Sequence, residues 1–288
     1  MKILGTGLSG LVGSRVVELL EPRYSFINFS LENGVDITNR DDIIARIEKE
    51  SDAPWILHLA AYTNVQQAEH DRLLGEQSNA WKVNVQATQH IIDACKKSRK
   101  KLLYVDTDYA FDGAKKSYSE DDIPSPLGWY AQTKSEGAKR VLAFGGLVIR
   151  ISNPYRANPQ GKTDFVHKML ERLQHHQEII APTDQLFVPT FIDDIAYAIE
   201  KLMVADAKGI YHVVGSQSLS PYDAAKTLAR LYGFDEACVK PTTFKEYFVG
   251  RAPVPQYASL TNAKIRALGV PMHGFKEGIA EMRLQELY

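Results

Sequence analysis

The sequence predicts an α/β fold: a doubly wound parallel sheet with a smaller, discontinuous C-terminal lobe. Through the first half of the chain, short apolar segments alternate with amphipathic helical segments, which is typical of a parallel sheet covered by helices. Two apolar runs, 55–60 and 102–105, are nearly continuous, as expected for strands buried on both faces. The second half is less regular, and Pro253 and Pro255 mark an irregular stretch.

The individual elements follow from the period of their apolar residues. Strands are predicted over 2–4, 25–29, 55–60, 102–105, 147–151 and 210–214. Helices are predicted over 14–20, 39–51, 80–97, 165–173, 195–204 and 220–232. The segment 179–189 reads as turn and extended structure.

Composition excludes several classes of protein. The 288 residues carry 34 Lys plus Arg against 35 Asp plus Glu, and this balance speaks against a dedicated nucleic-acid binder. No apolar run is long enough to span a membrane, and the first residues show no secretory cleavage pattern. Cys95 and Cys238 are isolated, and no cluster has metal-ligand spacing, so we expect a cytoplasmic protein with no metal site.

A glycine-rich turn joins the first predicted strand to the first predicted helix. It can be read as G-x-G-x-x-G through Gly5, Gly7 and Gly10, or as G-x-x-G-x-x-G through Gly7, Gly10 and Gly13. Glycines allow backbone N–H groups to approach a pyrophosphate, and the helix N-terminus then faces the negative charge. The strand–turn–helix context therefore favours a Rossmann-type dinucleotide site over a loop without a ligand.

The end of the second predicted strand bears on which dinucleotide binds. An NAD site usually has Asp or Glu roughly 20 residues after the glycines, and 27–31 contains no acid, with Glu32 slightly late. Arg15 and Arg23 are candidate partners for a 2′-phosphate, although either can equally be a solvated surface charge. We therefore expect NADP(H) in preference to NAD(H).

Tyr130 and Lys134 lie four residues apart at the start of a helical pattern, which places them on one helix face. A free tyrosine has a pKa of about 10, and a nearby ammonium group favours the phenolate and lowers that pKa. Such a pair can pass a proton to or from a substrate oxygen. Ordinary surface neighbours on a helix have the same spacing. The pair therefore indicates a catalytic site only in combination with the glycine turn.

A third group of polar residues follows the strand predicted over 102–105. Asp106, Thr107 and Asp108 stand where open α/β sheets bind ligands, at the carboxyl end of a parallel strand. Thr107 could hydrogen-bond a substrate carbonyl, or it could satisfy a backbone group at the strand end. The two aspartates could equally form a turn or cap a helix.

With these pieces together, the chain resembles the extended short-chain dehydrogenase/reductase superfamily, and within it the dTDP-4-dehydrorhamnose reductase family. The matching motifs are the glycines at 7, 10 and 13, the segments 36–38 and 59–63, Asn84, the segment 107–113, and the pair Tyr130 and Lys134. Later segments are similar too, at 184–190, 209–213 and 251–264. The resemblance covers nearly the whole length.

The resemblance implies NAD(P)H-dependent reduction of the C4 ketone of a nucleotide-linked 6-deoxy-hexulose, giving dTDP-L-rhamnose. It implies catalytic roles for Thr107, Tyr130 and Lys134, and substrate-binding roles for Thr107, Asp108, Tyr109, Asn153 and Arg251. Arg251 is the candidate for the substrate diphosphate, with a surface salt bridge as its alternative role. The implied cofactor-binding residues are Gly7, Leu8, Ser9, Gly10, Leu11, Val12, Gly13, Asn28, Ser30, Asp36, Ile37, Leu59, Ala60, Ala61, Tyr62, Asn84, Tyr130 and Lys134.

The change from a regular first half to a less regular second half divides the chain after about Ser152. Residues 1–152 and about 186–214 form the expected dinucleotide-binding domain, and about 153–185 and 215–288 form the expected substrate-binding lobe. A nucleotide sugar is the expected partner, a homodimer is compatible with the sequence, and neither nucleic acid nor membrane is expected.

Three departures from the family pattern bear on the sugar. Asp106 replaces the serine usual before the active threonine, Ala252 separates Arg251 from Pro253, and Phe187 stands where glycine is common. Two other functions stay open on the same fold. One is an NAD-dependent sugar-nucleotide epimerase or dehydratase, and the other is a non-catalytic regulatory subunit of a methionine adenosyltransferase.

Overall fold

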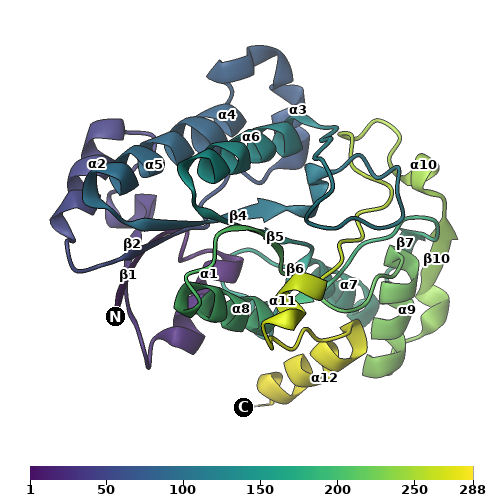
Figure 1. The fold of residues 1–288 in the computed structure, drawn as a ribbon. Helices are drawn as coiled ribbons and strands as arrows, with labels where there is room; N and C mark the ends of the chain where they lie inside the picture. Colours follow the sequence, from purple (N-terminus) through teal and green to yellow (C-terminus); the bar gives the residue numbers. More distant parts are fainter. Residues whose placement is uncertain (288) are drawn as a thin grey trace.

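A six-stranded parallel sheet forms the centre of the computed structural model, which describes residues 1–287 (Figure 1). Its strand order is β2-β1-β3-β4-β5-β9, and every neighbouring pair is parallel. The strands are β1 (Lys2–Thr6), β2 (Ser25–Phe29), β3 (Trp55–His58), β4 (Lys101–Thr107), β5 (Leu147–Ile151) and β9 (Gly209–His212). The predicted α/β class with a parallel sheet is confirmed.

The order of the strands reverses at β1, which positions the functional site. The chain passes from β1 to β2 on one side and then crosses to β3 on the other. Only one strand lies beyond β1 on the first side, whereas the common order 3-2-1-4-5-6 has two. The segment after β2 forms instead the short 3-10 helix η1 (Leu31–Asn33). Ligands of open α/β sheets bind at the carboxyl ends of the strands beside such a reversal.

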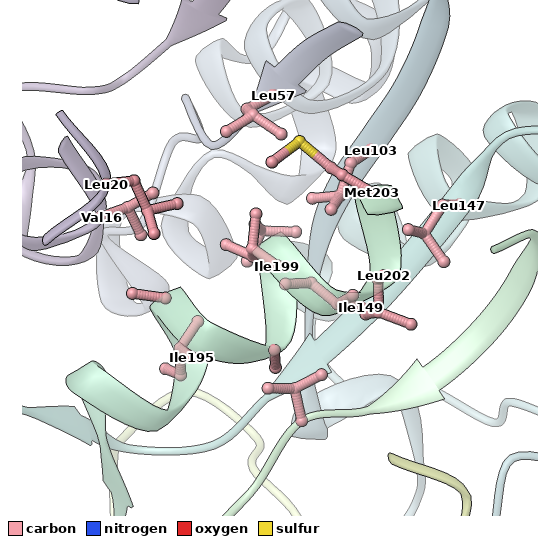
Figure 2. Close-up of a cluster of buried hydrophobic side chains, with 14 of the residues drawn as sticks. Val16, Leu20, Leu57, Leu103, Leu147, Ile149, Ile195, Ile199, Leu202 and Met203 are labelled. Atoms are coloured by element: carbon pink, nitrogen blue, oxygen red, sulfur yellow. The ribbon is translucent and has the colours of Figure 1, made fainter. Parts of the chain in front are cut away.

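Helices cover both faces of the sheet (Figure 1). On one face lie α2 (Arg40–Lys49), α5 (Ala87–Ser98) and α6 (Trp129–Phe144), whose apolar residues share a core with Leu4 and Ile56. On the other face lie α1 (Leu11–Leu20) and α8 (Ile192–Val204). Figure 2 shows Val16 and Leu20 of α1 and Ile195 and Ile199 of α8 within this second core, together with side chains of β3, β4 and β5. Fully burying each such side chain contributes about 1.5–3 kcal/mol.

A third core gathers the elements of the C-terminal lobe. Aromatic rings of Tyr155, Phe165, Phe187, Phe191 and Phe275 contact one another there. The surrounding helices are α7 (Phe165–Gln174), α9 (Pro221–Tyr232) and α12 (Phe275–Glu286), and two short parallel pairs complete the lobe, β6 (Pro154–Tyr155) with β8 (Thr190–Phe191) and β7 (Ile179–Pro182) with β10 (Val239–Thr242).

Short elements connect these layers. They are α3 (Val65–His70), η2 (Arg72–Gln77), α4 (Asn79–Trp81), η3 (Lys82–Gln86), η4 (Asp108–Ala110), η5 (Glu236–Cys238), α10 (Phe244–Tyr247) and α11 (Ala263–Ala267). Ile265 of α11 packs into the sheet core with Val270 and Met272, although these residues fall in the segment that the sequence assigns to the second lobe. The division into two domains stays a prediction. Within residues 1–287, no helix combines the length and the apolar character needed to cross a membrane.

Candidate active site

A cavity of about 770 Å³ opens at the carboxyl ends of the sheet strands. Its walls come from the glycine turn, the segment after β2, the segment after β3, the end of β4, the start of α6 and the loop before α7. These segments are far apart in sequence, and the parallel sheet brings them together because all its strand ends point to one edge.

The glycine turn is packed too tightly against the protein's own backbone for side chains at Gly7 and Gly13. Gly7 has a φ of 70°, and a Cβ there would lie 2.6 Å from the backbone nitrogen of Ala60. A Cβ at Gly13 would collide with the carbonyl oxygen of Gly7. Gly5 lies inside β1, so the geometry uses the glycines at 7, 10 and 13. Helix α1 begins directly after Gly10, and its free N–H groups make this end of the cavity suitable for a pyrophosphate.

The segment after β2 forms one end of the cavity. The hydroxyl oxygen of Ser30 is buried there without a hydrogen-bond partner within residues 1–287, and it can therefore meet a ligand hydroxyl or phosphate. The exposed Glu32 also lines this end. Neither arginine considered for a 2′-phosphate does so, because Arg15 pairs with Asp193 at 2.7 Å and Arg23 with Glu200 at 2.8 Å.

Asn84 stands behind the cavity wall. Within the predicted helix 80–97 the structure contains a π-helical turn, η3, and this turn carries Asn84. The side chain accepts a hydrogen bond from the Tyr62 N–H at 2.8 Å and donates to Thr133 Oγ1 at 3.0 Å. It therefore ties the segment after β3 to helix α6, which carries Tyr130 and Lys134.

Tyr130 and Lys134 both face the cavity from the first turns of α6. Lys134 is buried, its Nζ donates to the carbonyl oxygen of Val105 at 2.6 Å, and burial lowers its pKa to about 8. Burial raises the pKa of Tyr130 above its ordinary value, the neighbouring Thr107 side chain lowers it by less, and the charges of Asp106 and Asp108 raise it. Burial, rather than the charge of Lys134, therefore has the largest effect on this phenol.

A hydrogen-bonded chain connects the ends of β4 and β5. Thr107 Oγ1 donates to Asp108 at 3.0 Å, Ser152 Oγ donates to the other Asp108 oxygen at 2.7 Å, and Asn153 Nδ2 donates to Ser152 at 3.2 Å. Burial raises the pKa of Asp108 to about 6. Asn153 has a φ of 41°, a left-handed conformation that Asn tolerates better than most residues.

A second cavity, of about 340 Å³, adjoins the first and shares Asp108, Asn153, Phe165 and Lys168 with it. Tyr109, Arg172, Tyr247 and Phe248 are among its other lining residues. Arg251 lines neither cavity. It is exposed, and its guanidinium lies over the ring of Tyr247 at 4.2 Å.

Most residues that the sequence singles out line the first cavity: Gly7, Ser9, Gly10, Leu11, Val12, Ser30, Asp36, Ile37, Leu59, Ala60, Ala61, Tyr62, Thr107, Asp108, Tyr130, Lys134 and Asn153. Leu8, Gly13, Asn28 and Asn84 lie outside its lining. Asn28 supports the glycine turn instead, because its Oδ1 accepts a hydrogen bond from the Leu8 N–H at 3.2 Å.

Sequence reasoning missed the cationic wall formed by Lys162, Lys168 and Arg172. Lys168 and Arg172 are spaced i and i+4 on α7, the one local signal that could have linked them to each other. No pattern in the sequence connects them to β4. Within residues 1–287, no group of three or more His, Cys, Asp or Glu side chains is arranged to hold a metal ion.

Known proteins match this chain along nearly its whole length. A family model described as the RmlD substrate binding domain matches residues 1–287. A dTDP-4-dehydrorhamnose reductase from Aggregatibacter actinomycetemcomitans is 31% identical over 268 residues, which cover 90% of this chain and 87% of the relative. The beta subunit of methionine adenosyltransferase 2 from Mus musculus is 31% identical over 190 residues, which cover 62% of this chain and 56% of that subunit.

A solved structure gives the same result. The crystal structure of dTDP-4-dehydrorhamnose reductase from Bacillus anthracis in complex with NADP has a TM-score of 0.89 and 28% identity, and the match covers 99% of each chain. The resemblance seen in the sequence is thus confirmed, and the chain is an NAD(P)-dependent oxidoreductase of the extended short-chain dehydrogenase/reductase type. Within that superfamily, it belongs to the RmlD substrate binding domain family.

Proposed function

We propose that this protein reduces the C4 ketone of dTDP-4-dehydrorhamnose with NADPH and so forms dTDP-L-rhamnose. The observation that carries the proposal is the joining of two cavities at Asp108 and Asn153, directly beside Thr107. The larger cavity has the glycine turn of a dinucleotide site, and the smaller one has room for a second ligand. Thr107, Tyr130 and Lys134 all line the larger cavity.

The residues of the larger cavity suit an NAD(P) cofactor. Gly7, Gly10 and the start of α1 would hold its pyrophosphate, and Ser30 would meet the adenosine ribose or its phosphate. When bound, the cofactor supplies the hydride for the ketone. A preference for NADP(H) over NAD(H) stays a prediction: the neutral Ser30 suits a 2′-phosphate, whereas the Glu32 carboxylate opposes it.

Tyr130 is the proposed proton donor to the oxygen that becomes an alkoxide. Its raised pKa keeps the phenol protonated at neutral pH, which is the form that a donor needs. Thr107 would orient the substrate carbonyl. Its hydroxyl has one proton, which it donates to Asp108 in the structure, so that proton would have to turn from Asp108 to the carbonyl when the substrate binds. Lys134 would hold the nicotinamide ribose through the N–H groups that Val105 leaves free.

The smaller cavity is the proposed site of the nucleotide-sugar substrate. Lys168 and Arg172 would face its diphosphate, because a guanidinium pairs well with phosphate oxygens. Tyr109, Asp108 and Asn153 would contact the sugar where the two cavities meet. Arg251 would not contact the substrate itself but would position the ring of Tyr247, which lines the smaller cavity.

A relative among the known proteins supports a second candidate function, that of a regulatory subunit. The mouse relative described above is a subunit of a methionine adenosyltransferase, so a regulatory subunit on this fold is the alternative. The complete set of Thr107, Tyr130 and Lys134 at the cavity favours catalysis. A stoichiometric synthetase partner together with an absence of ketone reduction would favour the subunit.

The experiment is NADPH oxidation by the purified protein with dTDP-4-dehydrorhamnose and a panel of other nucleotide-linked 4-keto sugars. The expected result is one equivalent of NADPH consumed per ketone, with dTDP-L-rhamnose as product. Product formation without net cofactor consumption would point to an epimerase or dehydratase, since these recycle the cofactor. Turnover of none of the sugars would contradict the proposal. Sedimentation of the same sample would test the homodimer.

A further inference from the structure

A buried ion pair closes the carboxyl end of the sheet beneath the cavity. Asp106 of β4 and Arg150 of β5 face each other in the strand register, and Arg150 Nε donates to Asp106 Oδ2 at 3.1 Å. Their side chains are 0% and 1% exposed. Burying two charges costs free energy that their mutual attraction often does not recover. Stabilisation of the fold is therefore a weak explanation for this pair, and we expect the pair to have a second role.

The pair is oriented, with its negative end toward the cavity. Asp106 lines the cavity, and its Oδ1 has no hydrogen-bond partner within residues 1–287. Arg150 does not line it. The guanidinium lies over the ring of Phe111 at 5.0 Å, and its Nη1 contacts His212 Nε2 at 3.4 Å. Asp106 Oδ1, the carboxylate oxygen that Arg150 leaves unpaired, is therefore the one whose negative charge is felt by groups around the cavity.

Lys134 is the cation on that side. Its Nζ makes one hydrogen bond, to the carbonyl oxygen of Val105, and lies 3.9 Å from the centre of the Tyr104 ring. A fully buried ammonium with one oxygen partner is incompletely compensated. Val105 immediately precedes Asp106 on β4, so the strand end that holds Lys134 also carries the carboxylate.

Most of the other titratable groups around Lys134 supply no negative charge. Tyr104 on β4 has a pKa raised well above its ordinary value by burial, and Tyr130 on α6 also has a raised pKa, so both are neutral. His58 on β3 hydrogen-bonds to Thr6, and burial lowers its pKa to about 3, so it is neutral as well. On β5, Arg150 is committed to Asp106. Asp108, after β4, is a second carboxylate, but both of its oxygens accept hydrogen bonds, from Thr107 and Ser152, whereas Asp106 Oδ1 accepts none within residues 1–287.

We propose that Asp106 is the counter-charge of Lys134, a positioning residue that keeps the ammonium charged in its buried site. The proposal deepens the proposed function and rests on it only for the use made of the charged lysine. Burial and Asp106 act on Lys134 in opposite directions: burial lowers its pKa to about 8, and Asp106 raises it. Without the carboxylate, Lys134 should lose its proton at a lower pH.

The direct test measures the proton on Lys134 in the protein without cofactor. Lys134 lines the larger cavity, which is wide enough to admit acetic anhydride. This reagent acetylates the neutral amine, so the labelling rate of Lys134, followed by peptide mass spectrometry, gives a titration curve. For the wild type we expect a midpoint near pH 8. For Asp106→Asn we expect the midpoint to fall by about one pH unit, the lower end of what one close charge does. An unchanged midpoint would overturn the proposal.

Two further variants separate charge from structure. Asp106→Asn leaves Arg150 buried and unpaired, which could prevent folding, so Asp106→Asn combined with Arg150→Gln removes both charges at once. This double variant should show the same lowered midpoint, and a wild-type midpoint in it would contradict the proposal. Asp193→Asn removes a different carboxylate, one paired with Arg15 away from the cavity, and should leave the midpoint unchanged. A lowered midpoint in Asp193→Asn would mean that the loss of any carboxylate lowers the pKa of Lys134, and it would contradict a specific role for Asp106.

A second measurement asks what the charge is used for. The affinity for NADPH, measured by fluorescence between pH 6 and pH 9, should weaken through the same midpoint as the labelling curve in each variant. If labelling shifts and cofactor affinity does not, Asp106 still sets the charge of Lys134, and the role of Lys134 under the proposed function is wrong. If ketone reduction is absent altogether, the labelling result stands by itself.

Discussion

The side-chain amide of Asn84 hydrogen-bonds to both backbone polar groups of Tyr62, its N–H and its carbonyl. Its Oδ1 accepts from the Tyr62 N–H at 2.8 Å, and its Nδ2 donates toward the Tyr62 carbonyl at 3.3 Å. Two residues 22 apart thus make a backbone-like pair, and Tyr62 lines the larger cavity. The amide contributes no atom to the cavity lining, so its effect on a ligand must pass through the segment that it holds.

Asn84→Ala should weaken NADPH binding by about tenfold, because the segment after β3 loses its anchor and a buried N–H is left unpaired. An unpaired buried donor also costs about 1–3 kcal/mol of unfolding free energy. Titration of cofactor fluorescence and urea unfolding measure the two effects. Asp235→Ala is the matched control, since Asp235 caps η5, neither it nor its sequence neighbours line the cavity, and its loss should cost about 1 kcal/mol without affecting NADPH. Equal loss of affinity in both variants would contradict this role.

Tyr130→Phe should lower kcat by about 10²–10⁴-fold, because it removes the proton donor and keeps the ring. The affinity for NADPH should stay within about twofold, since the edge contact between the rings of Tyr109 and Tyr130 needs no hydroxyl. Steady-state kinetics and cofactor titration separate the two. Tyr118→Phe also removes a buried hydroxyl, one that donates to Asp112, and should leave kcat unchanged. A Tyr130→Phe enzyme with near-normal turnover would rule out the proposed donor.

The buried Asp108 gives the protein a measurable pH dependence of stability. Burial raises its pKa from about 3.8 to about 6, so its contribution to stability is full below pH 4 and is lost as the pH rises through about 6. Asn at this position keeps the shape without the charge. Between pH 4 and pH 7, the unfolding free energy of the wild type should therefore fall relative to Asp108→Asn by about 2 kcal/mol. Urea unfolding at four pH values tests this, and parallel curves would refute it.

The sequence predicted what local patterns encode. Strands β3 and β4 were visible as apolar runs, and Tyr130 and Lys134 shared a face because a spacing of four does so on any helix. Helix α12 was missed: its buried residues include Gly278 beside Ile279 and Met282, so its apolar stripe is weak.

Long-range pairings could not be predicted. Asp106 and Arg150 are 44 residues apart and meet only because β4 and β5 are neighbours in the sheet. Arg15 looked available for a phosphate, but its partner is Asp193, 178 residues away. Likewise, nothing local places α7 and its Lys168 beside the end of β4. Side-chain type was readable from the sequence, whereas the choice of partner depended on topology.

Glu32→Gln should tighten NADPH binding more than NADH binding, by about threefold, because only NADPH brings a 2′-phosphate toward this end of the cavity. The gain should shrink in high salt, since Glu32 is exposed and its field is screened. Calorimetry with both cofactors at low and high salt measures it. Glu48→Gln removes an exposed carboxylate on α2 and should change neither affinity. An equal gain for NADH and NADPH would place the 2′-phosphate elsewhere.

The two arginines near the smaller cavity should differ in their effect on the nucleotide sugar. Arg172 lines the cavity, so Arg172→Gln should raise KM by about tenfold with kcat nearly unchanged. This pattern is expected when a lost contact binds the substrate and the transition state equally well. Arg251 acts through the Tyr247 ring, and a cation–π contact at an exposed site is worth about 0.5–1 kcal/mol, so Arg251→Gln should raise KM by about threefold. Tyr247→Leu should then abolish the effect of Arg251→Gln but leave that of Arg172→Gln intact. If Arg251→Gln raises KM tenfold even in the Tyr247→Leu background, the guanidinium itself binds the diphosphate, and the loop carrying it must close over the cavity when substrate binds.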